Sequence, residues 1–194
     1  MKKTFFFLLL LLFLLAGCAA QDEELSKDTE IYKGNVINAD YKVPQNLTEL
    51  VSASEDIVQM KLVRNKKSGE ENNTISEVEI IKSYKGTYKT GNKIDISEPW
   101  FLVAGKYQAV ENYIALEKDL IYILFLNGGH DQSEINYISS MGYGKFCENL
   151  QEKTAIMQDF STVEEIQPYD FISNLDEEVL KYQEIKQEVL KTYN

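Results

Sequence analysis

One segment limits the fold of this chain more than any other: residues 120–126 read LIYILFL, and every position is apolar. A strand with one face in water alternates apolar and polar side chains, whereas a strand covered on both faces reads as a continuous apolar run. The short length of the run and the Gly128-Gly129 pair after it favour a strand over a helix. We therefore expect a central strand here, buried on both faces.

Alternating apolar residues on either side of this segment indicate further strands. Over residues 57–64 the apolar side chains fall at every second position, and Pro99 ends another short run. The connections are too short for helical crossovers, so the sheet is expected to be mostly antiparallel. The expected strands cover residues 57–64, 74–84, 93–97, 120–126, 135–140 and 143–147, with a polar loop over 65–73.

Two helices are expected at the ends of this strand-rich region. Asn46, followed three residues later by Glu49, is a capping-box arrangement that opens a short helix through about Ser54. A long helix is expected over residues 174–192, with acidic residues in its first turn. The fold class is therefore α+β. The amphipathic stripe of the long helix consists of Leu175, Val179, Tyr182, Ile185 or Lys186, and Val189.

The N-terminus begins with two lysines, Lys2 and Lys3, before an apolar run over residues 5–15 and the sequence Leu-Ala-Gly-Cys18. The run is about a dozen residues long, whereas crossing a bilayer takes about 20. This pattern resembles a bacterial lipoprotein signal peptide with its lipobox, which implies cleavage after residue 17 and lipidation of Cys18. The resemblance implies a lipid-anchored protein on the extracytoplasmic face of the bacterial cell membrane. The alternative is an uncleaved anchor helix with an incidental cysteine.

The segment after the lipobox, residues 18–30, is small, polar and acidic, and we expect a flexible tether. Residues 31–194 are then expected to form a single domain. Loss of Lys2 and Lys3 with the leader changes the net charge from −11 to −13. Such acidity disfavours nucleic acid and favours cationic partners, including metal ions and basic peptides. The alternative is a solvated acidic surface without a dedicated partner.

The chain has two cysteines, and lipidation of Cys18 leaves Cys147 alone, so no intramolecular disulfide is expected. Cys147 lies in a strand-like segment and is expected to be a small buried hydrophobe. The alternative is a nucleophile paired with His130, the single histidine of the chain.

Three phrases follow one another in the middle of the chain: SASEDIVQMKLV, NTISEVEIIKSYKGTYKTGNKIDISEP and LEKDLIYILFLNGG. Their order resembles a domain that recurs in secreted and lipid-anchored bacterial proteins, and it is similar to the netrin-like module of tissue inhibitors of metalloproteinases. The resemblance implies an OB-like barrel of five or more strands. Closure of a barrel removes exposed edges and would explain why residues 120–126 have no polar face. Netrin-like modules depend on disulfides, which this chain cannot form. The mechanism of the inhibitors is not implied, because it needs a free N-terminal cysteine.

Aromatic side chains near Gly and Pro form one candidate binding site. Such residues offer a large contact area at low entropic cost, and they often contact peptides or sugars. The alternative is that they plug the open end of a small barrel. The candidate residues are Trp100, Phe101, Tyr107, Tyr137 and Tyr143.

A second candidate is an oxygen-rich loop that contains Asn127, Asp131 and Glu134. Calcium prefers six to eight oxygen ligands in a flexible frame, and this loop supplies three side chains. The spacing does not match an EF-hand, and the alternative is an ordinary solvated loop.

A third candidate consists of paired carboxylates, because two carboxyl groups about 5–9 Å apart can hydrolyse glycosides. Glu77 and Glu79 lie two residues apart on one strand face, and Asp95 and Glu98 come from a neighbouring segment. The alternative is an ordinary acidic surface on the sheet.

The sequence has no Gly-rich phosphate loop, GxSxG, HExxH or CxxC motif, and we expect no cofactor. The favoured function is a non-enzymatic binding or accessory module, with a protein or peptide of the cell envelope as a candidate partner. The alternatives are an extracytoplasmic hydrolase that uses the paired carboxylates and a purely structural envelope protein.

Overall fold

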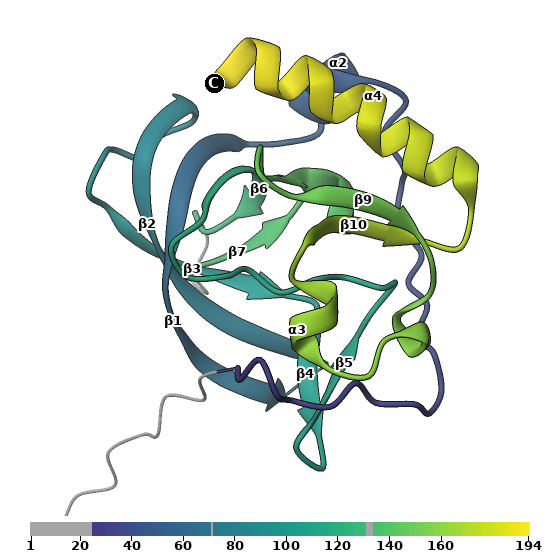
Figure 1. Ribbon diagram of the computed structural model, residues 1–194. Helices are drawn as coiled ribbons and strands as arrows, with labels where there is room; N and C mark the ends of the chain where they lie inside the picture. The colour runs from purple at the N-terminus through teal and green to yellow at the C-terminus, as the bar shows by residue number, and fades with distance from the viewer. Residues whose placement is uncertain (1–24, 71, 131–133) are drawn as a thin grey trace, which may run out of the picture.

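The computed structural model describes residues 25–70, 72–130 and 134–194, and it is α+β with a mostly antiparallel main sheet (Figure 1). The predicted leader and Cys18 lie outside these residues. Six strands form the main sheet: β1 (Asp56–Glu70), β2 (Asn73–Lys85), β3 (Lys93–Glu98), β6 (Ile121–Gly128), β7 (Ile135–Ile138) and β8 (Lys145–Phe146).

The strands of the main sheet pair in the order β1-β2-β3-β7-β6-β8, and β1 also pairs with β6. The pairings therefore lead from β1 through β2, β3, β7 and β6 back to β1. β3 and β7 run parallel, and the other pairs in this sheet are antiparallel.

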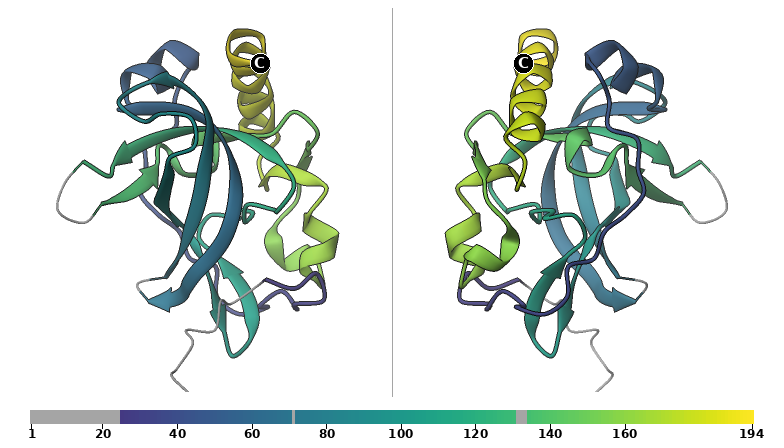
Figure 2. Two further views of the ribbon diagram at one scale, coloured as in Figure 1. Left: turned by 90° about the vertical axis from the view of Figure 1, so that its left-hand side faces the viewer. Right: turned by 90° about the vertical axis from the view of Figure 1, so that its right-hand side faces the viewer.

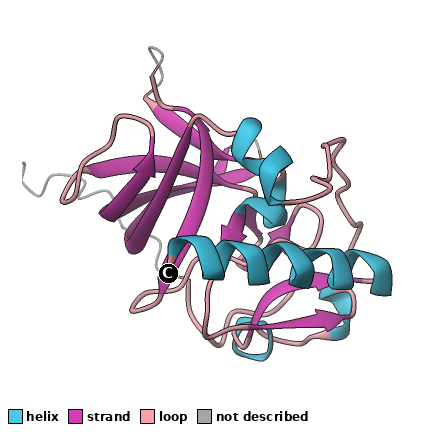
Figure 3. Cartoon of the chain, turned by 90° about the horizontal axis from the view of Figure 1, so that it is seen from above, coloured by secondary structure: helices cyan, strands magenta, loops and turns pink. Residues whose placement is uncertain are grey.

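Smaller elements cover the ends and one side of the main sheet. The hairpin β4–β5 and the parallel pair β9–β10 each form a separate two-stranded sheet. Figure 3 shows α4 crossing over the β9–β10 pair, against which it packs. These elements are β4 (Trp100–Val103), β5 (Lys106–Ala109), β9 (Gln151–Thr154), β10 (Tyr169–Ser173), α2 (Leu47–Ser52), α3 (Val163–Ile166) and α4 (Asp176–Tyr193), with short 3₁₀ turns at Met141–Gly144 and Met157–Asp159.

β6 confirms the predicted strand, and its residues 122–126 are buried on both faces, whereas Ile121 at its start is exposed. Tyr122, Leu124 and Leu126 belong to one hydrophobic cluster, together with inward residues of β1, β2 and β3. Ile123 and Phe125 point the other way, into a second cluster that includes residues of α2, β8, β10 and α4. Each face of β6 thus has its own core, which is why the segment has no polar side.

α4 confirms the predicted C-terminal helix and most of its stripe. Val179, Tyr182, Ile185, Lys186 and Val189 are buried on its inner face. Leu175 instead precedes the helix and is exposed. Within the three described ranges, no helix combines the length and the apolar composition needed to cross a lipid bilayer.

The expected polar loop at residues 65–73 is instead largely strand. β1 continues to Glu70 because β2 offers it a partner along its whole length, as far as Asn73. The strand expected at residues 143–147 is also different: a 3₁₀ turn occupies its start, and β8 is limited to Lys145 and Phe146.

The end of the expected tether packs against the domain. The Val163 amide donates to the Thr29 carbonyl oxygen, and Ile31 is buried and bridges to Tyr107. Figure 2 shows this N-terminal segment running beside α3. The packed part of the chain therefore begins by residue 25, earlier than the expected boundary at residue 31.

A buried ion network joins the main sheet to the C-terminal layer. Lys145 of β8 and Asp170 of β10 are both buried, and the Lys145 ammonium lies 3.2 Å from Asp170 Oδ1. Asp170 Oδ2 accepts hydrogen bonds from the Tyr182 hydroxyl and the Cys147 amide, and it lies 3.2 Å from the Lys186 ammonium. Lys186 also pairs with Glu152. One carboxylate thus serves four donors from β8, α4 and the chain after β8.

We predict that Asp170→Asn lowers the free energy of unfolding by about 3–5 kcal/mol, because it leaves the buried Lys145 ammonium without its ion-pair partner. Urea unfolding followed by circular dichroism measures the change. Glu184→Gln is the matched control, because the Lys181–Glu184 pair is on the surface and such pairs contribute at most about 1 kcal/mol. Equal losses in the two variants would contradict the role given to Asp170.

Candidate functional site

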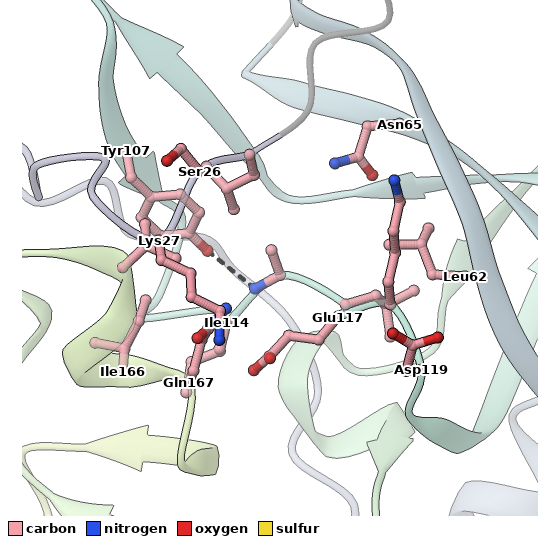
Figure 4. Close-up of a pocket in the computed structure, with 15 residues that line it drawn as sticks. Ser26, Lys27, Leu62, Asn65, Tyr107, Ile114, Glu117, Asp119, Ile166 and Gln167 are labelled. Atoms are coloured by element: carbon pink, nitrogen blue, oxygen red, sulfur yellow. Dashed lines mark hydrogen bonds between the residues drawn. The ribbon is translucent and has the colours of Figure 1, made fainter.

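A cavity of about 550 Å³ opens beside the N-terminal segment, and Figure 4 shows the residues around it. Its walls come from residues 25–27, β1, β5, the segment 114–119 that precedes β6, and α3 with the residue after it. A cavity of this size matches those that bind small molecules in proteins. Apolar side chains line much of it: Leu25, Leu62, Ile114, Ala115, Leu116, Val163 and Ile166.

Two buried tyrosines fix the segment that forms one wall. The Tyr107 hydroxyl donates to the Tyr113 carbonyl oxygen and accepts from the Ala115 amide, the bond drawn in Figure 4. The Tyr122 hydroxyl accepts from the Glu117 amide. The backbone of residues 113–117 is therefore tied to β5 and β6, and the position of Glu117 is set by the core.

Glu117 is one of the polar side chains around the cavity, and its carboxylate lies near Lys27 and Gln167 (Figure 4). Its Oε1 atom is buried and has no hydrogen-bond partner. Burial raises the pKa of Glu117 above its usual range, and the charges of Lys145 and Lys27 act in the opposite direction. A desolvated carboxylate oxygen without a donor is costly, so a donor brought within reach of this group would be stabilising.

Behind the cavity wall lies a second carboxyl group, Glu98 of β3, which is fully buried. Its Oε2 accepts from the Leu116 amide at 2.8 Å and from the Tyr113 hydroxyl at 3.1 Å, and its Oε1 lies against the Ser76 hydroxyl. Burial raises the pKa of Glu98, although these hydrogen bonds and Lys145 oppose the change.

The Ser76 hydroxyl connects two side chains of this network. It lies within hydrogen-bond distance of both Glu98 Oε1 and Asn65 Oδ1, and its one proton can be donated to only one of these oxygens at a time. Asn65 lines the cavity, so this chain of hydrogen bonds links the buried carboxyl group to the cavity wall.

The candidate carboxylates lie on two different faces of the sheet. Glu77 and Asp95 are opposite each other on β2 and β3, and the Lys66 ammonium lies 3.0 Å and 2.6 Å from them. Glu79 pairs with Lys61 on the same outer face. Glu98 points into the core, and none of these four acidic residues lines the cavity. The geometry therefore does not bring two of them together across a cleft.

The candidate aromatic residues are mostly core residues. Trp100, Phe101, Tyr107 and Tyr143 are buried, and the Trp100 and Tyr107 rings stack at 5.5 Å. Tyr107 also lines the cavity, whereas Tyr137 on β7 is 51% exposed. For four of the five side chains, this burial fits the alternative that they fill the core rather than form a binding surface.

The residues of the candidate calcium loop do not form a shared site among the described residues. Asn127 Oδ1 accepts from the Glu55 amide, and its Nδ2 donates to Ser139. Glu134 is exposed, and Asp131 is among the residues outside the description. Across the part of the chain that the structure describes, no group of three or more His, Cys, Asp or Glu side chains is placed to hold a metal ion.

Cys147 is buried in the first hydrophobic cluster, and burial raises the pKa of its thiol. A raised pKa disfavours the thiolate that a nucleophile needs. His130 has other neighbours: its Nε2 atom lies 2.6 Å from Asp56 Oδ2, and its ring stacks on Tyr88.

Glu117, Lys27 and Gln167 are cavity residues that the sequence patterns did not indicate. Glu117 lies in the segment before β6, Lys27 lies in the expected tether, and Gln167 follows the one-turn helix α3. None of them belongs to a sequence motif. For Glu117 the one signal is the change from Ile-Ala-Leu to Glu-Lys-Asp at residues 114–119, which places charge directly beside core residues.

No protein-family model matches this chain, and no curated protein sequence matches it either.

We predict that Glu98→Gln changes how stability depends on pH. A carboxyl group with a raised pKa in the folded state stabilises the fold below its unfolded pKa of about 4.3, and this contribution is lost as the pH rises through the folded value. Glutamine does not titrate, so the melting temperature of the variant minus that of the unmodified chain should increase between pH 4 and pH 8. A shift of one pKa unit corresponds to about 1.4 kcal/mol, or about 3–5 °C for a chain of this size.

The control is Glu188→Gln, at an exposed position of α4, for which the difference should stay constant with pH. A Glu98→Gln variant that is destabilised equally at pH 4 and pH 8 would refute a raised pKa at Glu98.

Proposed function

We propose that this protein is a lipid-anchored, extracytoplasmic binding protein whose ligand site is the cavity around Glu117. The single observation that supports a binding function is that cavity, which has apolar walls and a carboxylate oxygen without a partner. The lipobox pattern that ends at Cys18 supports the location.

We further propose that the main sheet is an OB-like barrel, in keeping with the netrin-like resemblance of the middle of the chain. Support comes from the closed series of pairings β1-β2-β3-β7-β6-β1 and from the parallel pairing of β3 with β7. In such a barrel the segment 114–119 and the β4–β5 hairpin form an insertion between β3 and β6 in chain order, and this insertion supplies part of the cavity wall.

The anchor and the cavity are close along the chain. Leu25, in the cavity wall, is seven residues after Cys18, and a fully extended chain of that length spans at most about 25 Å. A lipidated Cys18 would therefore hold the cavity near the membrane surface. A ligand that arrives along the membrane or from the neighbouring envelope would meet the cavity directly.

A binding function fits the chemistry of the site better than hydrolysis. Glu117 faces Lys27 and Gln167 rather than a second carboxylate at its end of the cavity (Figure 4), and Asp119 is exposed. The favoured partners are the membrane, through the lipid anchor, and a small molecule or an envelope protein or peptide that inserts a side chain. The net charge of −11 argues against nucleic acid.

We predict that Cys18 is required for lipidation. Cells that express the unmodified chain and are fed an alkyne analogue of palmitate should yield a labelled, membrane-bound protein, and Cys18→Ala should remove the label and release the protein from the membrane fraction. Cys147→Ala is the matched control and should label normally. A Cys18→Ala protein that still carries label and sediments with membranes would refute the anchor.

We predict that Leu25→Trp blocks the cavity. Leu25 is partly buried in the cavity wall, and a larger ring at this position takes up space that a ligand needs. A panel of fluorinated fragments, observed by ¹⁹F NMR with the full chain in lipid nanodiscs, should show fragments that bind the unmodified chain and are lost in the variant. Leu180→Trp, at an exposed position of α4, is the control. Fragments that bind Leu25→Trp unchanged would show that this cavity is not the ligand site.

A further inference from the structure

The chemistry of the cavity also indicates a class of ligand, and this inference rests on the proposed function of the cavity as a binding site. We propose that the cavity binds an organic cation, a protonated primary amine on an apolar chain, and that the Glu117 carboxylate receives its ammonium group. The source of the amine is either a free alkylamine or a lysine side chain of a peptide, since both present the same group.

The first argument is the state of the Glu117 carboxylate. Oε1 lies against the protein without any donor, while the Glu117 amide is already paired with Tyr122. The last torsion of a glutamate side chain is broad, so either oxygen can turn toward a group in the cavity at little cost. An ammonium supplies three donors and a compensating charge, and charge-assisted hydrogen bonds are about twice as strong as neutral ones.

The second argument is the location of the other charges at the cavity. Lys27, Lys118 and Asp119 are exposed, so water screens their charges. Glu117 is only partly accessible, and burial is the main cause of its raised pKa. The charge that gains most from a partner is therefore negative, which selects a cation over an anion.

The third argument is the surrounding surface. Leu62, Ile114 and Ile166 line the same cavity and offer an apolar wall to a hydrocarbon chain next to the carboxylate. The net charge of −11 also raises the local concentration of cations around the molecule. An inorganic cation would leave the apolar wall unused, whereas an alkylamine uses both parts of the site.

Isothermal titration calorimetry on the full chain in phosphatidylcholine nanodiscs tests this proposal, with empty nanodiscs as the blank. The probes are n-hexylamine, n-hexanol and hexanoate, which share a chain length and differ in charge. We expect n-hexylamine to bind most tightly. Glu117→Gln should weaken it by about tenfold or more, because a hydrogen bond to a charged group contributes about 1.5–3 kcal/mol. Asp119→Asn, two residues away and exposed, should change the affinity by less than about twofold.

A second pair of probes identifies the source of the amine. These are acetyl-Leu-Lys-Leu-amide and its counterpart with norleucine in place of lysine. Tighter binding of the lysine peptide than of n-hexylamine, with loss in Glu117→Gln, would assign the site to a peptide lysine. The reverse order would assign it to a free amine.

Two results would overturn the ligand class while leaving a binding site in place. One is n-hexanol or hexanoate binding as tightly as n-hexylamine, and the other is n-hexylamine affinity unchanged by Glu117→Gln in a variant with an unaltered melting temperature. If none of the five probes binds, the amine proposal is refuted. The fragment experiment with Leu25→Trp then decides separately whether the cavity binds any ligand.

Discussion

The burial of β6 on both faces is the constraint on which the rest of the structure depends. Alternate side chains of this strand belong to two hydrophobic clusters, and the strand pairs with β1, β7 and β8. A strand of this kind needs a cover on each side. The main sheet supplies one cover, and α2, β10 and α4 supply the other. The buried Asp170 network then joins β8 to β10 and α4.

The position of the cavity follows from the way the chain enters β6. The segment before this strand crosses the end of the first cluster, and its backbone is tied down by Tyr107 and Tyr122. Two carboxyl groups beside or within this segment are held in a partly dry environment. Glu98 of β3 accepts from the Leu116 amide and the Tyr113 hydroxyl, whereas Glu117 has an oxygen without a donor. In the proposed function, this difference separates a structural carboxyl group from the one that would receive a ligand.

Sequence patterns predicted those elements whose apolar pattern or capping residues lie within the element itself. The apolar run of β6 and the stripe of α4 indicated their burial, and the Asn46 side chain does cap α2 by accepting from the Glu49 amide. Two kinds of element were missed: a hairpin whose turn lacks the usual residues, and a strand that is defined by a partner elsewhere in the chain. β4 and β5 turn through Ala104 and Gly105 at positive φ, with an alanine where a turn signal would have Asn or Gly.

The polar strand β9 is likewise defined only by its pairing with β10. The candidate site was missed for the same reason: Glu117 becomes unusual only through burial, which no local pattern records. The aromatic candidates, chosen by type and by nearby turns, are mostly core residues instead.

The measurement that tests the account most directly is the intact mass of the protein extracted from its native membrane. We predict a polypeptide that begins at Cys18 and carries fatty acyl chains on that residue. A mass that matches the unmodified chain from Met1 would contradict the anchored location on which the proposed function depends.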